Sequence, residues 1–163
     1  MFFGIETGCL LGFVVSKDGI QIDPLKIATI LALPAPTNLL ELENLQGKEN
    51  FLHHFVCNFA EKTHGYMHLL KKDTLFFWDD HAQRAFINIK HDLTHSPMIQ
   101  PPNYLKDFLL YVSTSTTTIR MVLAQEDRNG LEHVIYYASK KLLDFQTRYS
   151  CVEKLALATI ISV

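Results

Sequence analysis

Histidines are the residues of this 163-residue chain with the clearest potential for metal chemistry. Two pairs, His64 with His68 and His91 with His95, are spaced four residues apart, and on a helix such a pair can chelate zinc. Neither pair has the glutamate of a His-Glu-x-x-His motif or a Cys-x-x-Cys pair to complete four ligands. We therefore interpret the histidines as surface or partly buried side chains and expect no metal site.

Two adjacent carboxylates, Asp79 and Asp80, offer a second possibility. Paired carboxylates can hold a divalent ion for phosphoryl transfer. These two also precede a segment with helical spacing of apolar residues, where acidic side chains accept hydrogen bonds from free N–H groups and favour the positive end of the helix dipole. Helix capping explains both residues, so we predict a cap here.

Motifs for nucleotide binding or nucleophilic catalysis are absent from the sequence. There is no Gly-x-x-x-x-Gly-Lys or Gly-x-Gly-x-x-Gly phosphate loop and no Gly-x-Ser-x-Gly elbow.

The net charge is −2, and residues 48–90 hold six Lys/Arg against five Asp/Glu. This balance argues against tight binding of a polyanion by charge alone. Three scattered cysteines, with no apolar run long enough to span a bilayer and no signal peptide, favour a reduced intracellular protein of the cytoplasm or nucleus.

The elements that would position these residues begin with a β-hairpin. Leu10–Val15 and Ile20–Ile22 read as its strands, and Asp23 with Pro24 reads as the N-cap and first position of a helix. Asn38 and Glu41 have the spacing of a capping box.

Further helices and one strand are expected in the middle of the chain. Helical spacing predicts one helix over Phe59–Lys72 and another after Asp79, with a short strand at Leu75–Trp78 between them. Prolines near residues 97–102 predict a domain boundary at about residue 102.

The last third reads as a three-stranded antiparallel sheet followed by a helix. The expected strands are Phe108–Ser113, Ile119–Glu126 and His133–Ser139, and the helix begins near Gln146. Its apolar pattern continues to Val163 without a stop signal, from which we expect a fragment of a longer protein or a truncated reading frame. The predicted fold class is α+β.

Several weak motifs in a fixed order resemble the Pol polyprotein of gypsy-type LTR retrotransposons, especially those of plants. They include Leu10-Leu11-Gly12-Phe13-Val14-Val15-Ser16, Asp23-Pro24, Leu45-Gln46-Gly47, Ala82-x-x-Ala85-Phe86, Val122-Leu123-Ala124-Gln125, Ile135-Tyr136-Tyr137-Ala138-Ser139-Lys140 and Arg148-Tyr149-Ser150. The resemblance implies a palm-end hairpin, thumb and connection-like subdomain over residues 1–102. It implies a truncated RNase H-like domain over residues 103–163.

The resemblance also implies that the catalytic set is incomplete. The polymerase aspartates of the family lie upstream of the Leu10 hairpin. The first metal-binding aspartate of its ribonuclease H falls at Ser113, and the following glutamate falls at Leu155. The family uses Mg²⁺, for which a serine hydroxyl is a poor ligand. We expect no enzyme activity and no cofactor.

With no enzyme activity expected, the resemblance still implies weak binding of an RNA–DNA hybrid or a nucleic-acid duplex. The candidate phosphate contacts are Lys17, Lys48, His53, His54, Lys62, Lys71 and Lys72. Because histidine is mostly neutral at pH 7, His53 and His54 are expected to bind phosphate more strongly below about pH 6.5.

Two alternatives remain open from the sequence. An incomplete RNase H-like sheet would leave an open strand edge and an uncovered face, which suits a protein partner, self-association or a relic domain without function. An active hydrolase could rebuild a metal site from Asp127, Asp144 and Glu153.

Overall fold

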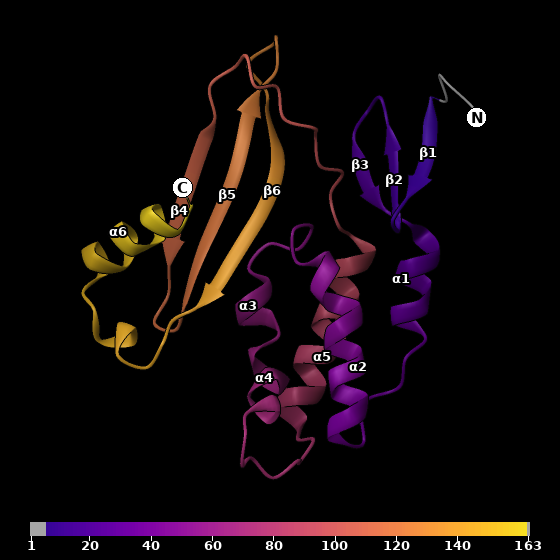
Figure 1. Cartoon of the computed structure of the whole chain (residues 1–163), viewed down its shortest axis with the longest axis vertical. Coiled ribbons are helices and arrows are strands. Elements are labelled where there is room, and N and C mark those ends of the chain that lie inside the picture. The colour runs from indigo at the N-terminus through magenta and orange to yellow at the C-terminus, as the bar shows by residue number, and fades with distance from the viewer. Residues whose placement is uncertain (1–5, 163) are drawn as a thin grey trace.

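The chain folds into two antiparallel sheets with a helical body between them (Figure 1). The computed structural model describes residues 6–162. Its strands are β1 (Thr7–Leu10), β2 (Phe13–Ser16), β3 (Ile20–Ile22), β4 (Leu109–Thr114), β5 (Thr118–Glu126) and β6 (Glu132–Lys141). Its α-helices are α1 (Pro24–Leu31), α2 (Leu39–Glu49), α3 (Phe59–Lys62), α4 (His64–Met67), α5 (Asp80–Thr94) and α6 (Cys151–Ser162). Short 3₁₀ turns are η1 (Asn50–Leu52), η2 (His68–Leu70) and η3 (Gln146–Arg148).

The α+β class is confirmed, with a hairpin, a helical body, a second three-stranded antiparallel sheet and a final helix in that order. The strand orders are β1-β2-β3 and β4-β5-β6. No helix within residues 6–162 combines the length and apolar character needed to cross a membrane. The predicted helix extension to Val163 lies outside the described residues.

The expected caps are confirmed. Asp23 Oδ1 accepts the Leu25 N–H at 2.9 Å and starts α1, while Asn38 Oδ1 accepts the Glu41 N–H at 2.9 Å and starts α2. Asp79 Oδ1 accepts the Ala82 N–H at 2.7 Å, and Asp80 lies in the first turn of α5. The two aspartates are therefore used to begin a 15-residue helix.

The first predicted strand, Leu10–Val15, is wrong because a turn divides it. Leu11 (φ 53°) and Gly12 (φ 87°) both have positive φ, which is the backbone of a tight two-residue hairpin turn. Leu10 therefore ends β1, and Phe13 begins β2. The sheet has one more strand than the sequence predicted.

The single helix predicted over Phe59–Lys72 is also wrong. Thr63 lies between α3 and α4 with ψ −7°, and its buried hydroxyl donates to Phe59 O at 2.9 Å. A threonine that bonds back onto its own helix competes with the regular pattern of backbone hydrogen bonds. The result is two short helical segments and the turn η2.

The segment Leu75–Trp78 is not a strand. The exposed fractions of Leu75 and Phe77 are 92% and 73%, while Phe76 and Trp78 pack against the core, so burial does alternate. No strand among residues 6–162 pairs with the segment, and Trp78 Nε1 instead donates to Gln83 Oε1 at 2.8 Å. The predicted helix start near Gln146 is wrong too, because Tyr149 is extended and α6 begins at Cys151.

Two apolar cores hold the fold. The larger lies among β3 and helices α1 to α5, and the smaller lies between α6 and the β4-β5-β6 sheet. Lys90 Nζ joins α5 to the end of α1 by donating to Leu31 O at 2.9 Å and Leu33 O at 2.6 Å. These bonds satisfy carbonyls at a helix C-terminus, where a cation is favourable.

A buried carboxyl lies inside the larger core. Glu49 at the end of α2 is fully buried, and the Tyr66 hydroxyl from α4 lies 3.0 and 2.9 Å from its two oxygens. Tyr66 is also fully buried and stacks on Trp78 at 5.7 Å. Burial raises the pKa of Glu49 to about 7, although the bond from Tyr66 opposes this shift.

Glu49→Gln is expected to change how stability depends on pH. Since the folded pKa lies above the ordinary value of 4.5, the wild-type chain loses stability as pH rises from 4.5 to 7, by roughly 3 kcal/mol. Glutamine keeps the acceptor for Tyr66 but cannot ionise, so this loss should vanish. Urea unfolding followed by Trp78 fluorescence from pH 4.5 to 8 measures the difference. Glu43→Gln on the exposed face of α2 is the control, and equal slopes in wild type and Glu49→Gln would contradict the expectation.

Candidate nucleic-acid interface

The seven residues predicted to contact phosphate do not form one surface. Lys17 lies in the β2–β3 turn, and Lys71 and Lys72 follow η2 at the opposite end of the helical body (Figure 1). Lys48 is exposed on α2, beside a hollow lined by Pro34 and Pro36. A phosphate backbone that contacts the β2–β3 turn would therefore have to follow the whole helical body to reach Lys71.

Two of these lysines have acidic partners. Lys17 Nζ lies 2.9 Å from Glu6 Oε1, and both side chains are largely exposed. Lys62 Nζ lies 2.6 Å from Asp92 Oδ2 in a half-buried pair between α3 and α5. Lys71 and Lys72 are exposed and form no ion pair with any residue from 6 to 162. With Lys48, which is also exposed and forms no ion pair with a described residue, they are the predicted contacts best placed to meet a phosphate.

His53 and His54 lie against the second sheet. Their ring centroids are 3.7 Å apart, and the His54 ring meets Tyr136 edge-on at 5.7 Å. Tyr137 N–H donates to His54 O at 3.0 Å, and His54 Nδ1 lies 3.3 Å from Tyr137 O. Burial, and then repulsion from His53, lower the pKa of His54. Any gain of charge at this residue therefore lies at lower pH than for an ordinary histidine.

Ser113 and Leu155 come from the two elements that form the smaller core. Ser113 is exposed on β4 and Leu155 is half-buried on α6. Val112 packs with Met121 and Ala158 in that core, so the next residue along the strand points to the face of the sheet away from α6. Ser113 is in register with Arg120 on β5, which places a guanidinium on the same face beside it. Arg120 Nε is buried and has no hydrogen-bond partner among the described residues.

The rebuilt metal site proposed from Asp127, Asp144 and Glu153 is wrong. Asp127 directly follows Glu126, the last residue of β5. Asp144 comes shortly after Lys141, the last residue of β6, which pairs with Thr118 at the start of β5. The nine-residue strand between them spans roughly 26 Å. Glu153 Oε2 accepts the Ser150 N–H at 2.8 Å, while Ser150 Oγ accepts the Glu153 N–H at 3.3 Å, so Glu153 caps α6.

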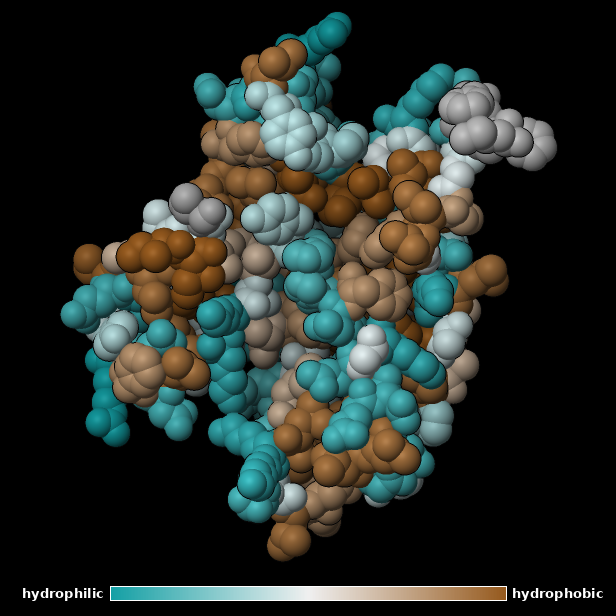
Figure 2. All heavy atoms as spheres, viewed as in Figure 1, coloured by the Kyte–Doolittle hydropathy of each residue, from teal (hydrophilic) through white to brown (hydrophobic). Residues whose placement is uncertain are grey.

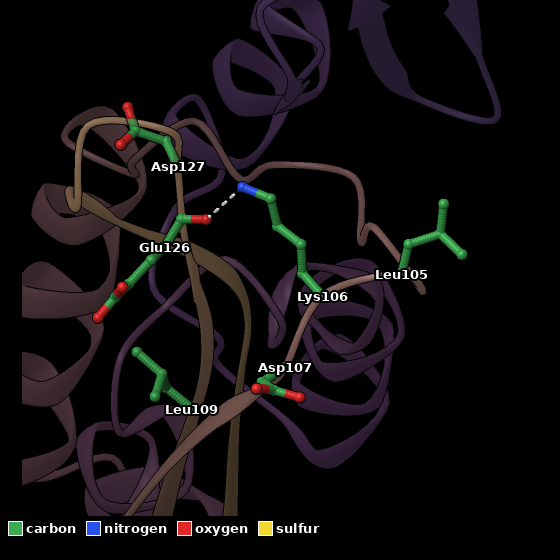
Figure 3. Close-up of a pocket in the computed structure, with 6 residues that line it drawn as sticks. All are labelled: Leu105, Lys106, Asp107, Leu109, Glu126 and Asp127. Atoms are coloured by element: carbon green, nitrogen blue, oxygen red, sulfur yellow. Dashed lines mark hydrogen bonds between the residues drawn. The ribbon is translucent and has the colours of Figure 1, made fainter.

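A hollow beside the β5–β6 hairpin is mostly acidic. It has a volume of about 500 Å³ and carries Asp107, Glu126 and Asp127. Figure 3 shows these three carboxylates pointing in different directions, while Lys106 Nζ donates to Glu126 O at 2.9 Å. Across residues 6–162 no three His, Cys, Asp or Glu side chains form a group that could hold a metal ion.

An apolar hollow lies between the β1-β2-β3 sheet and the β4-β5-β6 sheet. It has a volume of about 340 Å³ and is lined by Phe13, Ile20, Phe51, His54, Phe55, Ile99 and Tyr136. Figure 2 shows hydrophobic surface running between the two sheets at this level. The Phe13 and Phe55 rings stack with their centroids 5.2 Å apart, and both side chains pack with the larger core.

Sequence reasoning missed a group of basic side chains around Lys62 and Lys71. His81 and Arg84 from α5 line a hollow with Lys62 and His64, and Lys141 from β6 lies close enough to act on His64. Nothing in the residue spacing brings Lys141 to α4, because some 77 residues separate them. Only the contact between the helical body and the second sheet brings them together.

Comparison with known proteins gives one family. The model of the RNase H-like domain found in reverse transcriptase matches residues 78–163. The chain is 31% identical over 151 residues to the retrovirus-related Pol polyprotein from transposon 297 of Drosophila melanogaster, covering 92% of this chain and 14% of the relative. It is 29% identical over 153 residues to the transposon Tf2-3 polyprotein of Schizosaccharomyces pombe, covering 94% of this chain and 12% of the relative. The chain thus spans about one-seventh of these relatives.

Solved structures show the same fold. The foamy viral protease-reverse transcriptase in complex with double-stranded DNA superposes with a TM-score of 0.84 at 21% identity, covering 96% of this chain and 27% of that chain. The same enzyme in complex with an RNA/DNA hybrid gives 0.83 at 21% identity, covering 96% of this chain and 21% of that chain. The chain therefore belongs to the family of RNase H-like domains found in reverse transcriptase, within the corresponding region of retrotransposon and retroviral Pol polyproteins.

Proposed function

We propose that this chain is a catalytically incomplete reverse transcriptase and RNase H-like segment, of the plant-like gypsy type, whose retained activity is weak binding of an RNA–DNA hybrid or duplex. Residues 1–102 would supply the palm-end hairpin, thumb and connection, and residues 103–163 the RNase H-like part. The observation that carries the proposal is Ser113. The resemblance requires a metal-binding aspartate at this position, and the residue in register with it is Arg120.

The residues present do not fit the Mg²⁺ of the family. A serine hydroxyl is neutral, Leu155 offers no ligand, and the guanidinium of Arg120 beside Ser113 repels a divalent cation.

Binding is supported by the fold and by exposed lysines. The two foamy viral structures, of which 27% and 21% share the fold of this chain, are complexes with double-stranded DNA and with an RNA/DNA hybrid. A net charge of −2 argues that binding to a duplex is weak and depends on a few exposed lysines.

Affinity for a labelled RNA–DNA hybrid is expected to fall steeply with salt. Between about 50 and 200 mM salt, a chain that neutralises three or four phosphates should lose roughly a hundredfold in affinity. Fluorescence anisotropy at several salt concentrations gives the slope. A folded sample without binding at the lowest salt would overturn the proposed binding function.

The double variant Lys71→Gln with Lys72→Gln is expected to lose two phosphate contacts. The slope of log affinity against log salt concentration should therefore become shallower by about 2. Lys17→Gln is the matched control, since Glu6 already holds this lysine at 2.9 Å and the slope should change little. A larger effect from Lys17→Gln than from the double change would place the contact surface at the hairpin instead.

Cleavage of the hybrid is expected to be absent with Mg²⁺ or Mn²⁺. Product formation is followed on a denaturing gel, with Glu153→Gln as a parallel sample because Glu153 is the nearest surviving family carboxylate. Cleavage by the purified wild-type chain that exceeds the background of an unfolded sample would contradict catalytic incompleteness.

A second candidate function is self-association through β4. Within the described part of the chain β4 pairs with β5 alone, and its flank exposes Phe108, Leu110 and Tyr111 with exposed fractions of 41%, 37% and 48%. A free strand edge can pair with a second chain. Dimerisation that rises with concentration, without hybrid binding, would favour this function over the first.

A further inference from the structure

A run of hydroxyl residues joins β4 to β5. They are Ser113, Thr114, Ser115, Thr116, Thr117 and Thr118. Ser115 N–H donates to Thr118 O at 2.8 Å, which makes Thr116 and Thr117 the central residues of a tight turn. Ser115 Oγ lies 2.8 Å from Thr118 Oγ1, so these two hydroxyls are engaged with each other. Thr116 is exposed, and its hydroxyl forms no hydrogen bond with residues 6–162.

A buried lysine of α6 reaches this turn. Lys154 is 7% exposed, and its Nζ donates to Thr116 O at 3.4 Å. This long bond is the only one that its ammonium group forms with the described residues, although such a group carries three N–H donors. Lys154 also forms no ion pair within residues 6–162. Because burying a charge is costly unless it is paired and hydrogen-bonded, a negative charge at the turn would stabilise the protein.

Two carboxylates of the elements beside the turn are already engaged. Glu153 Oε2 accepts a backbone N–H at the start of α6 at 2.8 Å, and Glu61 Oε2 accepts the Thr118 hydroxyl at 3.3 Å. Two further lysines, Lys140 and Lys141, end β6 and pair with the first residues of β5. The turn therefore lies among ammonium groups from α6 and β6, and the buried one is unpaired within the described part of the chain.

We propose that Thr116 is a phosphorylation site and that Lys154 binds the phosphate. A Ser/Thr protein kinase would transfer the γ-phosphoryl group of ATP to Thr116 Oγ1. The bond between that phosphorus and the bridging oxygen of ADP breaks, the Oγ1–P bond forms, and the hydroxyl proton goes to a base of the kinase. The product carries a charge of about −1.5 to −2 near pH 7 and three strong acceptor oxygens.

Covalent attachment suits this position better than capture of a free anion. The carbonyl that Lys154 contacts and the free hydroxyl belong to the same residue, Thr116. A phosphate on that hydroxyl is therefore held near the ammonium group, without the loss of translational freedom that a free ion would pay on binding. The inference stands apart from nucleic-acid binding and holds whether or not the chain binds a duplex.

The phosphate would tie the β4–β5 turn to α6. These two parts of the chain share the smaller apolar core, whose buried residues are Ile119, Met121, Leu142 and Ala158. Since this core is small, one charge-assisted contact at its end is a substantial addition to its stability. Phosphorylation would therefore control how firmly α6 is held on the second sheet.

The first experiment compares the unmodified chain with a chain that carries genetically encoded phosphothreonine at position 116. The phosphate should raise Tm by about 2–4 °C, the shift expected from one good contact in a chain of this size. Its second pKa, followed by ³¹P NMR, should lie below the ordinary value of about 6, because the ammonium group favours the dianion. An unchanged or lower Tm with an ordinary phosphate pKa would overturn the pairing.

Two lysine variants identify the partner of the phosphate. Lys154→Met removes the charge and keeps the length of the side chain, so both the Tm shift and the lowered phosphate pKa should disappear. Lys106→Met is the matched control, because Lys106 donates to Glu126 O at the other end of β5, and both effects should persist. Persistence of both effects in Lys154→Met would overturn the assignment of Lys154. If Lys154→Met does not fold, Thr116→Asp in the wild-type background decides, since a carboxylate beside Lys154 should raise Tm and a loss of Tm overturns the pairing.

The last experiment tests whether Thr116 is a kinase substrate. The folded chain is incubated with ATP and a panel of Ser/Thr kinases, and phosphopeptides are mapped by mass spectrometry. Phosphate is expected on Thr116, and the same phosphopeptide should be lost in Thr116→Val. Phosphate on other residues alone, or none on the chain, would overturn the modification site.

Discussion

The outer edge of β6 is the constraint on which the arrangement of the molecule depends. A strand edge carries backbone groups that must find partners, and β6 finds them in the helical body. Tyr137 N–H donates to His54 O at 3.0 Å, and Val134 O accepts the Gln100 N–H at 2.8 Å. Ser139 Oγ accepts the Ala60 N–H at 2.8 Å. These contacts attach one sheet to the helices and fix which surfaces of each half face one another.

The attachment has electrostatic consequences. It places Thr118 Oγ1 at 3.3 Å from Glu61 Oε2, and the hollow beside this bond is lined by Lys62 and His64 of the helical body and by Thr117 of the second sheet. It also places the His54 ring against Tyr136, where a protonated histidine is disfavoured by burial. The contact with β6 therefore disfavours a positive charge on His54, one of the predicted phosphate contacts, and brings a different set of basic side chains together.

Local signals in the sequence were strongest where one residue type has one dominant physical role. Asp23, Asn38 and Asp79 each cap a helix as predicted, because the hydrogen bond of a cap involves residues two or three positions away. The signals failed where a neighbour far along the chain decides the outcome. Leu75–Trp78 has the alternating burial of a strand, but no strand lies beside it. Glu49 looks like a surface residue of α2 in sequence and is buried because Tyr66 reaches it from α4.

The sequence by itself determined the α+β class, three helix caps, the three strands of the second sheet and the family, since hydrophobic periodicity, caps and ordered motifs are properties of neighbouring residues. Tertiary structure decided that Asp127 and Asp144 lie at opposite ends of the sheet, that Ser113 faces Arg120, and that His64, His81 and Lys141 meet. Strand register and helix packing set these distances, and both depend on contacts between residues that the sequence keeps far apart.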